Sequence, residues 1–217
     1  LYNEDHQKYI DYNIKDVQLI ERLEEKMGLI ELAMTMAFRG GVNFSETFGT
    51  TSIWDSILYR MLNKQQIVVP PKVNKAKQPY PGAFVKDPMV GLHEWVASFD
   101  LNSLYPNIIV QYNMSPETII EGKIPGVNVD KILDGQEFIL EDDYAVAATG
   151  QQFTKERVGI IPSIIKQYYD ERRAIKNRML EAQQEYEKRK TKKLENEINT
   201  LENQQMSIKI LMNSLYG

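Results

Sequence analysis

Apolar residues recur every three or four positions in three stretches of the N-terminal part of the chain. This spacing predicts helices over residues 5–27, 29–38 and 51–62. Gly28 follows the first stretch, in the position where glycine commonly ends a helix. In the third stretch the apolar residues lie along one stripe and are expected to be buried core: Ile53, Trp54, Ile57, Leu58, Met61 and Leu62.

Residues 163–216 contain no glycine and no proline, which predicts helix throughout. The first apolar stripe there is Ile164, Ile165, Tyr168, Tyr169, Ile175, Met179 and Tyr186. The second is Leu194, Ile198, Leu201, Ile208, Leu211 and Leu215. A single helix would be about 80 Å long at ~1.5 Å per residue. We therefore expect two antiparallel helices that turn near Thr191, within the basic segment 188–193, and bury their stripes on each other.

Residues 95–113, WVASFDLNSLYPNIIVQYN, join two different patterns. Residues 95–99 are rich in strand-forming side chains, whereas Pro106 suits the first turn of a helix. We therefore expect a strand, a tight bend that carries Asp100, and a helix start. Backbone N–H groups at a helix start attract anions, and a carboxylate beside them can hold a cation. The stretch predicts chemistry that involves a metal and a phosphate.

The remaining segments are irregular. Residues 65–81 hold four prolines and three lysines and are predicted to form an exposed loop. Its lysines either contact a phosphate strand or are simply solvated; the sequence leaves both open. Residues 115–144 are rich in turn residues, and we find no chemistry there.

Composition narrows the kind of metal site. The chain has 217 residues, no cysteine and two histidines, so disulfides and thiolate sites are excluded and a histidine zinc site is disfavoured. A hard cation on oxygen ligands remains. The net charge is −4, but residues 155–217 carry 13 Lys and Arg against 9 Asp and Glu, so the basic charge is concentrated in the predicted hairpin. No apolar run approaches the length of a membrane span.

Helical spacing brings several polar side chains onto shared faces. Arg172 and Lys176 are four residues apart, and so are Tyr12 and Asp16. Lys209, Asn213 and Tyr216 form a line of cation, amide and aromatic ring on one face of the second predicted helix. Spacing alone fits a solvated helix surface at least as well as a binding site.

Together these residues resemble the motifs of family B DNA polymerases. DLNSLYP, which begins at Asp100, resembles the A motif DxxSLYP, and KILMNSLYG, which begins at Lys209, resembles the B motif KxxxNSxYG. Arg172 and Lys176 resemble the Rx3K pair of the fingers helix. YNIKD, residues 12–16, resembles the third exonuclease motif Yx3D. The stretches YPGAFVKDP, SFDLNSLYPNII and SPETI look most similar to the replicative polymerases of T-even-like phages.

The resemblance implies roles for the residues of the A motif. Asp100 would be one of two catalytic, metal-binding aspartates of the palm, and the Leu101 carbonyl would be a further metal ligand. Backbone N–H groups around Ser103 and Leu104 would hold the triphosphate tail. Tyr105 would stack under the sugar and exclude a 2′-hydroxyl.

It implies roles for the other motifs as well. Arg172, Lys176 and the catalytic Lys209 would bind the nucleotide phosphates. Asn213 would also bind the nucleotide. Contacts to the nascent base pair would come from Tyr216 and Gly217. In the 3′–5′ proofreading site, Asp16 would be a metal ligand and Tyr12 would orient the attacking water.

The implied fold class is α+β. Residues 1–28 would end an exonuclease domain, residues 29–154 would hold connecting helices and part of a palm sheet, and residues 155–208 would form the fingers hairpin. Residues 209–217 would carry motif B. Two Mg²⁺ ions are expected per polymerase site, but the DTDS motif with the second aspartate and the exonuclease DxE motif are absent from the sequence. We therefore expect a fragment that is inactive by itself.

Expected partners are primer–template DNA, dNTP and, through regions not present here, a sliding clamp and the replisome. No membrane association is expected, and the location would be the cytoplasm of the host cell. The main alternative is a non-enzymatic helical protein whose charged hairpin binds a partner. A protein-primed member of the same family is a nearer alternative.

Overall fold

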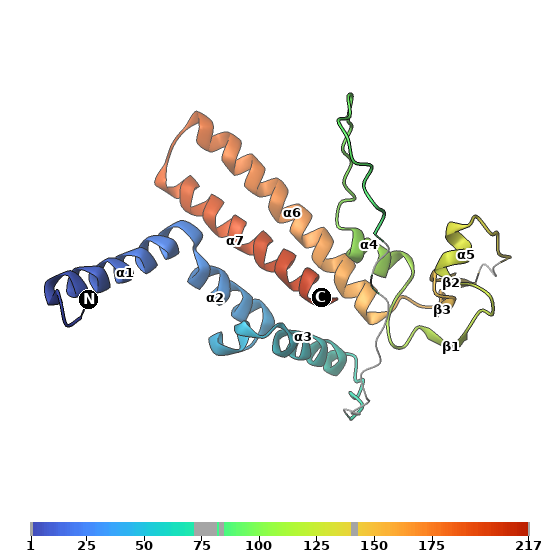
Figure 1. Cartoon of the computed structure of the whole chain (residues 1–217). Helices are drawn as coiled ribbons and strands as arrows, with labels where there is room; N and C mark the ends of the chain where they lie inside the picture. Colours follow the sequence, from blue (N-terminus) through green and yellow to red (C-terminus); the bar gives the residue numbers. More distant parts are fainter. Residues whose placement is uncertain (1, 72–81, 83–84, 140–142, 217) are drawn as a thin grey trace.

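The computed structural model describes residues 2–71, 82, 85–139 and 143–216. Figure 1 shows a helical body with a small sheet at one end. The helices are α1 (His6–Met27), α2 (Leu29–Gly40), α3 (Thr50–Lys64), α4 (Leu104–Gln111), α5 (Val129–Leu133), α6 (Ile160–Lys188) and α7 (Lys192–Ser214), with a 3₁₀ helix over Phe44–Phe48. The strands are β1 (Ile119–Lys123), β2 (Tyr144–Val146) and β3 (Gln151–Thr154).

Helices α6 and α7 form the antiparallel hairpin that the two apolar stripes predict (Figure 1). The turn falls at Thr191, whose side-chain oxygen accepts a hydrogen bond from the Leu194 N–H at 3.3 Å and so caps α7. Toward the tip the hairpin buries Met179, Ala182 and Leu201 between its own helices. The predicted turn is therefore confirmed.

The base of the hairpin packs against α2 and α3 to form the main core. The core comprises Met36, Ile53, Trp54, Ile57, Ile164, Ile165, Tyr168, Ile208, Leu211 and Met212. Trp54 also fixes the end of α7, because its indole N–H lies 3.1 Å from both the Leu211 carbonyl and the Ser214 hydroxyl. Arg39 of α2 pairs with Glu171 of α6 at 2.9 Å. Within the predicted apolar stripe of α3, Ile53, Trp54 and Ile57 are confirmed as buried core and Leu58 and Met61 pack against it, whereas Leu62 does not belong to this core.

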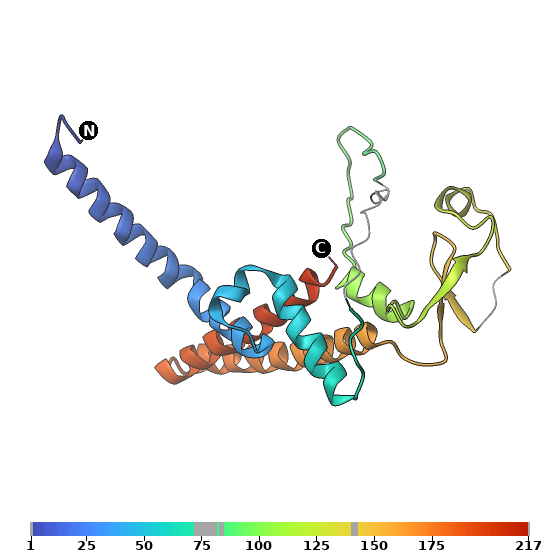
Figure 2. The same cartoon turned by 90° about the horizontal axis from the view of Figure 1, so that it is seen from below.

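Helix α1 projects away from this body (Figure 2). It begins where Asp5 accepts a hydrogen bond from the Lys8 N–H and ends at Gly28, whose φ of 59° is the left-handed conformation that glycine tolerates. No residue of α1 is buried. The helix was correctly predicted, but its apolar residues Tyr12, Val17, Ile20 and Leu23 are exposed.

The sheet is antiparallel with strand order β1-β3-β2. Phe153 of the central strand pairs with Ile119 on one side and Ala145 on the other, and its ring is buried. The combination of long helices with this sheet confirms the α+β class. None of the helices in the described residues is both long and apolar enough to cross a membrane.

The strand predicted over residues 95–99 is not present. These residues form no ladder, and the side chains of Trp95 and Phe99 are 99% and 94% exposed. A strand needs a neighbouring strand for its N–H and C=O groups, and the described residues offer none here. The helix start after Asp100 is confirmed as α4. Most of the proline-rich loop, residues 72–81, lies outside the described residues.

Candidate nucleotide-binding site

The bend after Asp100 places backbone N–H groups at the start of α4. Ser103 precedes α4 with φ 53°, an uncommon left-handed conformation for a serine. Asn107 stabilises the bend, because its side-chain amide donates to the Asn102 carbonyl at 2.9 Å and its N–H donates to the Ser103 carbonyl at 3.1 Å. The first-turn N–H groups of Leu104 and Tyr105 have no intrahelical acceptor, so they are available to an anion.

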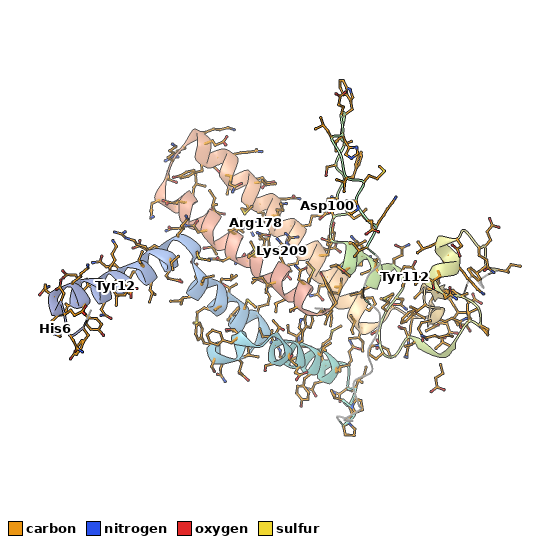
Figure 3. All side chains as sticks on the ribbon, in the orientation of Figure 1. His6, Tyr12, Asp100, Tyr112, Arg178 and Lys209 are labelled. Atoms are coloured by element: carbon orange, nitrogen blue, oxygen red, sulfur yellow. The ribbon has the colours of Figure 1, made fainter. Side chains whose placement is uncertain are left out.

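Asp100 lies where the exposed stretch meets α4 (Figure 3). Its side chain and that of Leu101 are exposed. The described residues contain no group of three or more His, Cys, Asp or Glu side chains arranged to hold a metal. One carboxylate and one carbonyl fit part of a hard-cation site and leave most coordination positions to other groups.

Cations of α6 face the residues that precede α4. A cavity of about 120 Å³ is lined by Asn102, Tyr169, Arg172, Arg173 and Lys176. Arg172 is oriented from the other hairpin helix, since its Nε donates to Oε1 of the buried Gln205 at 3.2 Å. The predicted pair Arg172 and Lys176 therefore meets the A-motif segment.

Three of these lining residues were not predicted from the sequence. Tyr169 and Arg173 are four residues apart and share the face that Arg172 and Lys176 border, so helical spacing could have indicated them. Asn102 lies between two residues that were predicted. Nothing local to Asn102 indicates a partner on α6.

A second contact joins the A and B motifs. The rings of Tyr105 and Tyr216 stack with centroids 4.9 Å apart and an angle of 24° between planes. The Tyr216 hydroxyl donates to Oδ1 of Asn213 at 2.8 Å. Burial raises the pKa of Tyr216, and neighbouring Tyr105 adds to the effect, so the hydroxyl remains a protonated donor. Tyr105, Asn213 and Tyr216 thus form one connected group.

Lys209 stays apart from these contacts. Lys209 is exposed on α7 and does not line the 120 Å³ cavity. Gly217 lies outside the described residues. The structure therefore places the predicted residues in two groups. Arg172 and Lys176 share a cavity with Asn102 of the A motif, and Asn213 and Tyr216 are connected to Tyr105.

Tyr12 and Asp16 belong to a different part of the molecule. Both lie on α1, and Figure 3 shows Tyr12 on that helix, far from Asp100. The Tyr12 side chain is exposed and Asp16 is half-buried. These two residues do not join the site at α4.

Comparison with known proteins decides the family. The sequence profile of DNA polymerase family B matches residues 47–217. The chain belongs to DNA polymerase family B. It is 36% identical over 183 residues to a DNA-directed DNA polymerase of Escherichia phage RB69, an alignment that covers 84% of this chain and 20% of the relative. The DNA-directed DNA polymerase of Enterobacteria phage T4 is 34% identical over 174 residues. That alignment covers 80% of this chain and 19% of the relative.

An archaeal structure supports the same fold. The family B DNA polymerase from Pyrobaculum calidifontis superimposes with a TM-score of 0.66 at 23% identity, over 99% of this chain and 26% of that one. The chain thus spans about a fifth of the length of its phage relatives. The family B resemblance that the A and B motifs indicate is confirmed.

Proposed function

We propose that the protein to which this chain belongs is a DNA-directed DNA polymerase that transfers a nucleotidyl group from a dNTP to a primer 3′-hydroxyl. The observation that carries the proposal is the cavity where Arg172 and Lys176 of α6 face Asn102 of the A motif. Phosphoryl transfer depends mainly on positioning and charge neutralisation, and paired cations beside free helix N–H groups supply both.

In this proposal Arg172, Lys176 and Lys209 bind the triphosphate, with Lys209 approaching from α7. N–H groups around Ser103 and Leu104 bind its oxygens. Asp100 and the Leu101 carbonyl would hold Mg²⁺, which neutralises charge on the reacting phosphate and the leaving pyrophosphate. The remaining ligands would come from other parts of the enzyme.

The tyrosine contact fits the sugar and base end of the nucleotide. Tyr105 would lie under the deoxyribose, where its ring leaves no room for a 2′-hydroxyl. Tyr216, Asn213 and Gly217 would line the nascent base pair. The stacking distance between Tyr105 and Tyr216 supports one shared surface for both tasks.

The domain assignment is also part of the proposal. Residues 1–28 would end a 3′–5′ exonuclease domain in which Asp16 binds a metal and Tyr12 orients water. Residues 29–154 would connect it to the palm, and residues 155–208 would form the fingers. Residues 209–217 would carry motif B.

Primer–template DNA and dNTP are the proposed partners, with a sliding clamp and replisome proteins engaged elsewhere in the enzyme. A cytoplasmic location in the host is proposed with them. A helical interaction protein, in contrast, would give no role to the cavity between α6 and the A motif.

Primer extension by the full-length polymerase tests the proposal. Arg172→Ala should raise the KM for dNTP by roughly tenfold or more, because a charge-assisted phosphate contact is lost. Arg178→Ala is the matched control, since Arg178 lies on the same helix, is exposed and pairs only with Glu197 among the described residues, at 3.9 Å. Absence of template-directed incorporation by the wild-type enzyme would refute the function.

A further inference from the structure

A short segment after α4 binds the start of α6. Residues 113–118, NMSPET, here called the capping segment, follow α4 after one intervening residue. Their side chains accept hydrogen bonds from three consecutive backbone N–H groups. The pairs are Gly159 N–H to Asn113 Oδ1 (2.8 Å), Ile160 N–H to the Glu117 carboxylate, and Ile161 N–H to Ser115 Oγ (3.3 Å).

These bonds do what a local capping residue does in most helices. The N-cap position of α6 is Gly159, which has no side chain to accept the free N–H groups. The acceptors come instead from residues more than forty positions earlier in the chain. The cap therefore connects two distant segments.

The contact is close and is made in both directions. The Asn113 side-chain amide donates to the Thr154 and Arg157 carbonyls at 2.7 and 2.8 Å. A Cβ on Gly159 would lie 2.6 Å from the Ser115 Cβ, so no larger residue fits without movement. The approach of the two backbones is fixed by packing as well as by hydrogen bonds.

Glu117 is central to the cap. One carboxylate oxygen accepts from Ile160, and the other accepts from the Ser115 hydroxyl at 2.7 Å. Arg157 donates to the Glu117 carbonyl at 3.0 Å. An ionised carboxylate at the start of a 29-residue helix is also favoured by the helix dipole.

The same two helices carry the candidate phosphate site. Helix α4 packs along α6, and Pro106 and Val110 line one cavity with Ile165 and Tyr169. Asn102 lies just before α4, and Arg172 lies three turns into α6. A cap that holds the end of α4 to the start of α6 therefore sets where Arg172 and Lys176 lie relative to Asn102.

We infer that Glu117 is a positioning residue for nucleotide binding. Through its bonds to Ile160 and Ser115 it holds α6 at the angle at which Arg172 and Lys176 face the A motif. The inference rests on the proposed polymerase function and goes beyond it, because Glu117 lies outside the A, B and Rx3K motifs.

Steady-state incorporation by the full-length polymerase tests this role. Glu117→Ala removes both acceptors and should raise the KM for dNTP roughly tenfold while kcat changes less than threefold. Glu117→Gln keeps one acceptor without charge and should restore part of the loss. Glu121→Ala, an exposed glutamate on neighbouring β1, should behave as wild type.

The readouts separate positioning from simple loss of structure. Primer–template affinity and exonuclease rate should stay unchanged in Glu117→Ala, since neither depends on the α6 cations. Equal loss of all activities in both Glu117 variants would overturn the inference. A KM for dNTP in Glu117→Ala that equals the KM of Glu121→Ala would overturn it as well. If Glu117→Ala does not fold, the KM of Glu117→Gln decides. Inactivity of the wild-type enzyme would instead refute the proposed function.

Discussion

Tyr105 and Tyr216 are separated by more than a hundred residues in sequence, yet their rings stack at 4.9 Å. The contact joins the first turn of α4 to the residues just after α7. Two motifs that look independent in the sequence thus share one aromatic surface. A change in either tyrosine should therefore affect the position of the other.

The first prediction concerns sugar selection. In the full-length polymerase, Tyr105→Ala should lower the ratio of dNTP to rNTP incorporation efficiency by at least tenfold, because the ring that would fill the space at C2′ is gone. Single-nucleotide incorporation with matched dNTP and rNTP measures this ratio. Tyr105→Phe keeps the ring and should retain discrimination. An unchanged ratio in the alanine variant would remove Tyr105 from the sugar site.

The second prediction concerns the single carboxylate at the bend. Asp100→Asn should lower the polymerisation rate by a factor of about 10³ or more, since a neutral amide is a poor ligand for a hard divalent cation. Exonuclease activity in the same preparation should persist, because Tyr12 and Asp16 lie on α1. Asp134→Asn, an exposed aspartate at the end of α5, is the control. Normal extension by Asp100→Asn would exclude Asp100 from the metal site.

The third prediction is a pH dependence of stability. Partial burial acts to raise the pKa of Glu117, but hydrogen bonds from the Ile160 N–H, the Ser115 hydroxyl and its own N–H, together with Arg157, outweigh burial and lower it below its ordinary 4.5. A lowered folded pKa stabilises the fold above pH 4.5, and this stabilisation is lost as pH falls through the folded value.

Glu117→Gln should therefore destabilise the protein at pH 7 and have a smaller effect at pH 3.5. Urea unfolding at both pH values gives the two differences. Glu121→Gln should give no such pH-dependent difference, since Glu121 is exposed. A difference that is the same at both pH values would contradict the assignment of the lowered pKa.

The fourth prediction tests how α3 holds the hairpin. Trp54→Phe removes the indole N–H that donates hydrogen bonds to the Leu211 carbonyl and the Ser214 hydroxyl. The smaller ring also leaves a gap beside Tyr168. The expected loss of unfolding free energy is about 1–3 kcal/mol. Tyr59→Phe, at an exposed position of the same helix, should change it by less than about 0.5 kcal/mol. Thermal or urea unfolding of both variants makes the comparison.

The helices were predictable because their signals are local. Apolar spacing along one face, Gly28 at the end of α1 and Thr191 before α7 all lie within a few residues of what they determine. The strand expected at residues 95–99 was wrong for the opposite reason. Strand propensity is local, but a strand forms only beside another strand, and none is available to it among the described residues.

The site was predictable only in part. The A and B motifs, and the pair Arg172 and Lys176, were predicted from their resemblance to family B motifs, because the four-residue spacing of the pair fits a solvated helix surface at least as well. Which partner orients each residue could not be predicted, since Gln205 is thirty-three positions from Arg172 and the acceptors of the α6 cap precede that helix by more than forty. Residues 115–144 looked free of chemistry because a glutamate that caps a distant helix has no sequence pattern of its own.

The length of α6 has a mechanical consequence. The helix runs without a break for 29 residues from Ile160, whose N–H is held by the cap. At ~1.5 Å per residue, Arg172 lies about 18 Å along this lever from its pivot, and Lys188 about 42 Å. A rotation of about 10° at the pivot would displace Arg172 by about 3 Å and Lys188 by about 7 Å. Small angular errors at Glu117 therefore become shifts as long as a hydrogen bond at Arg172.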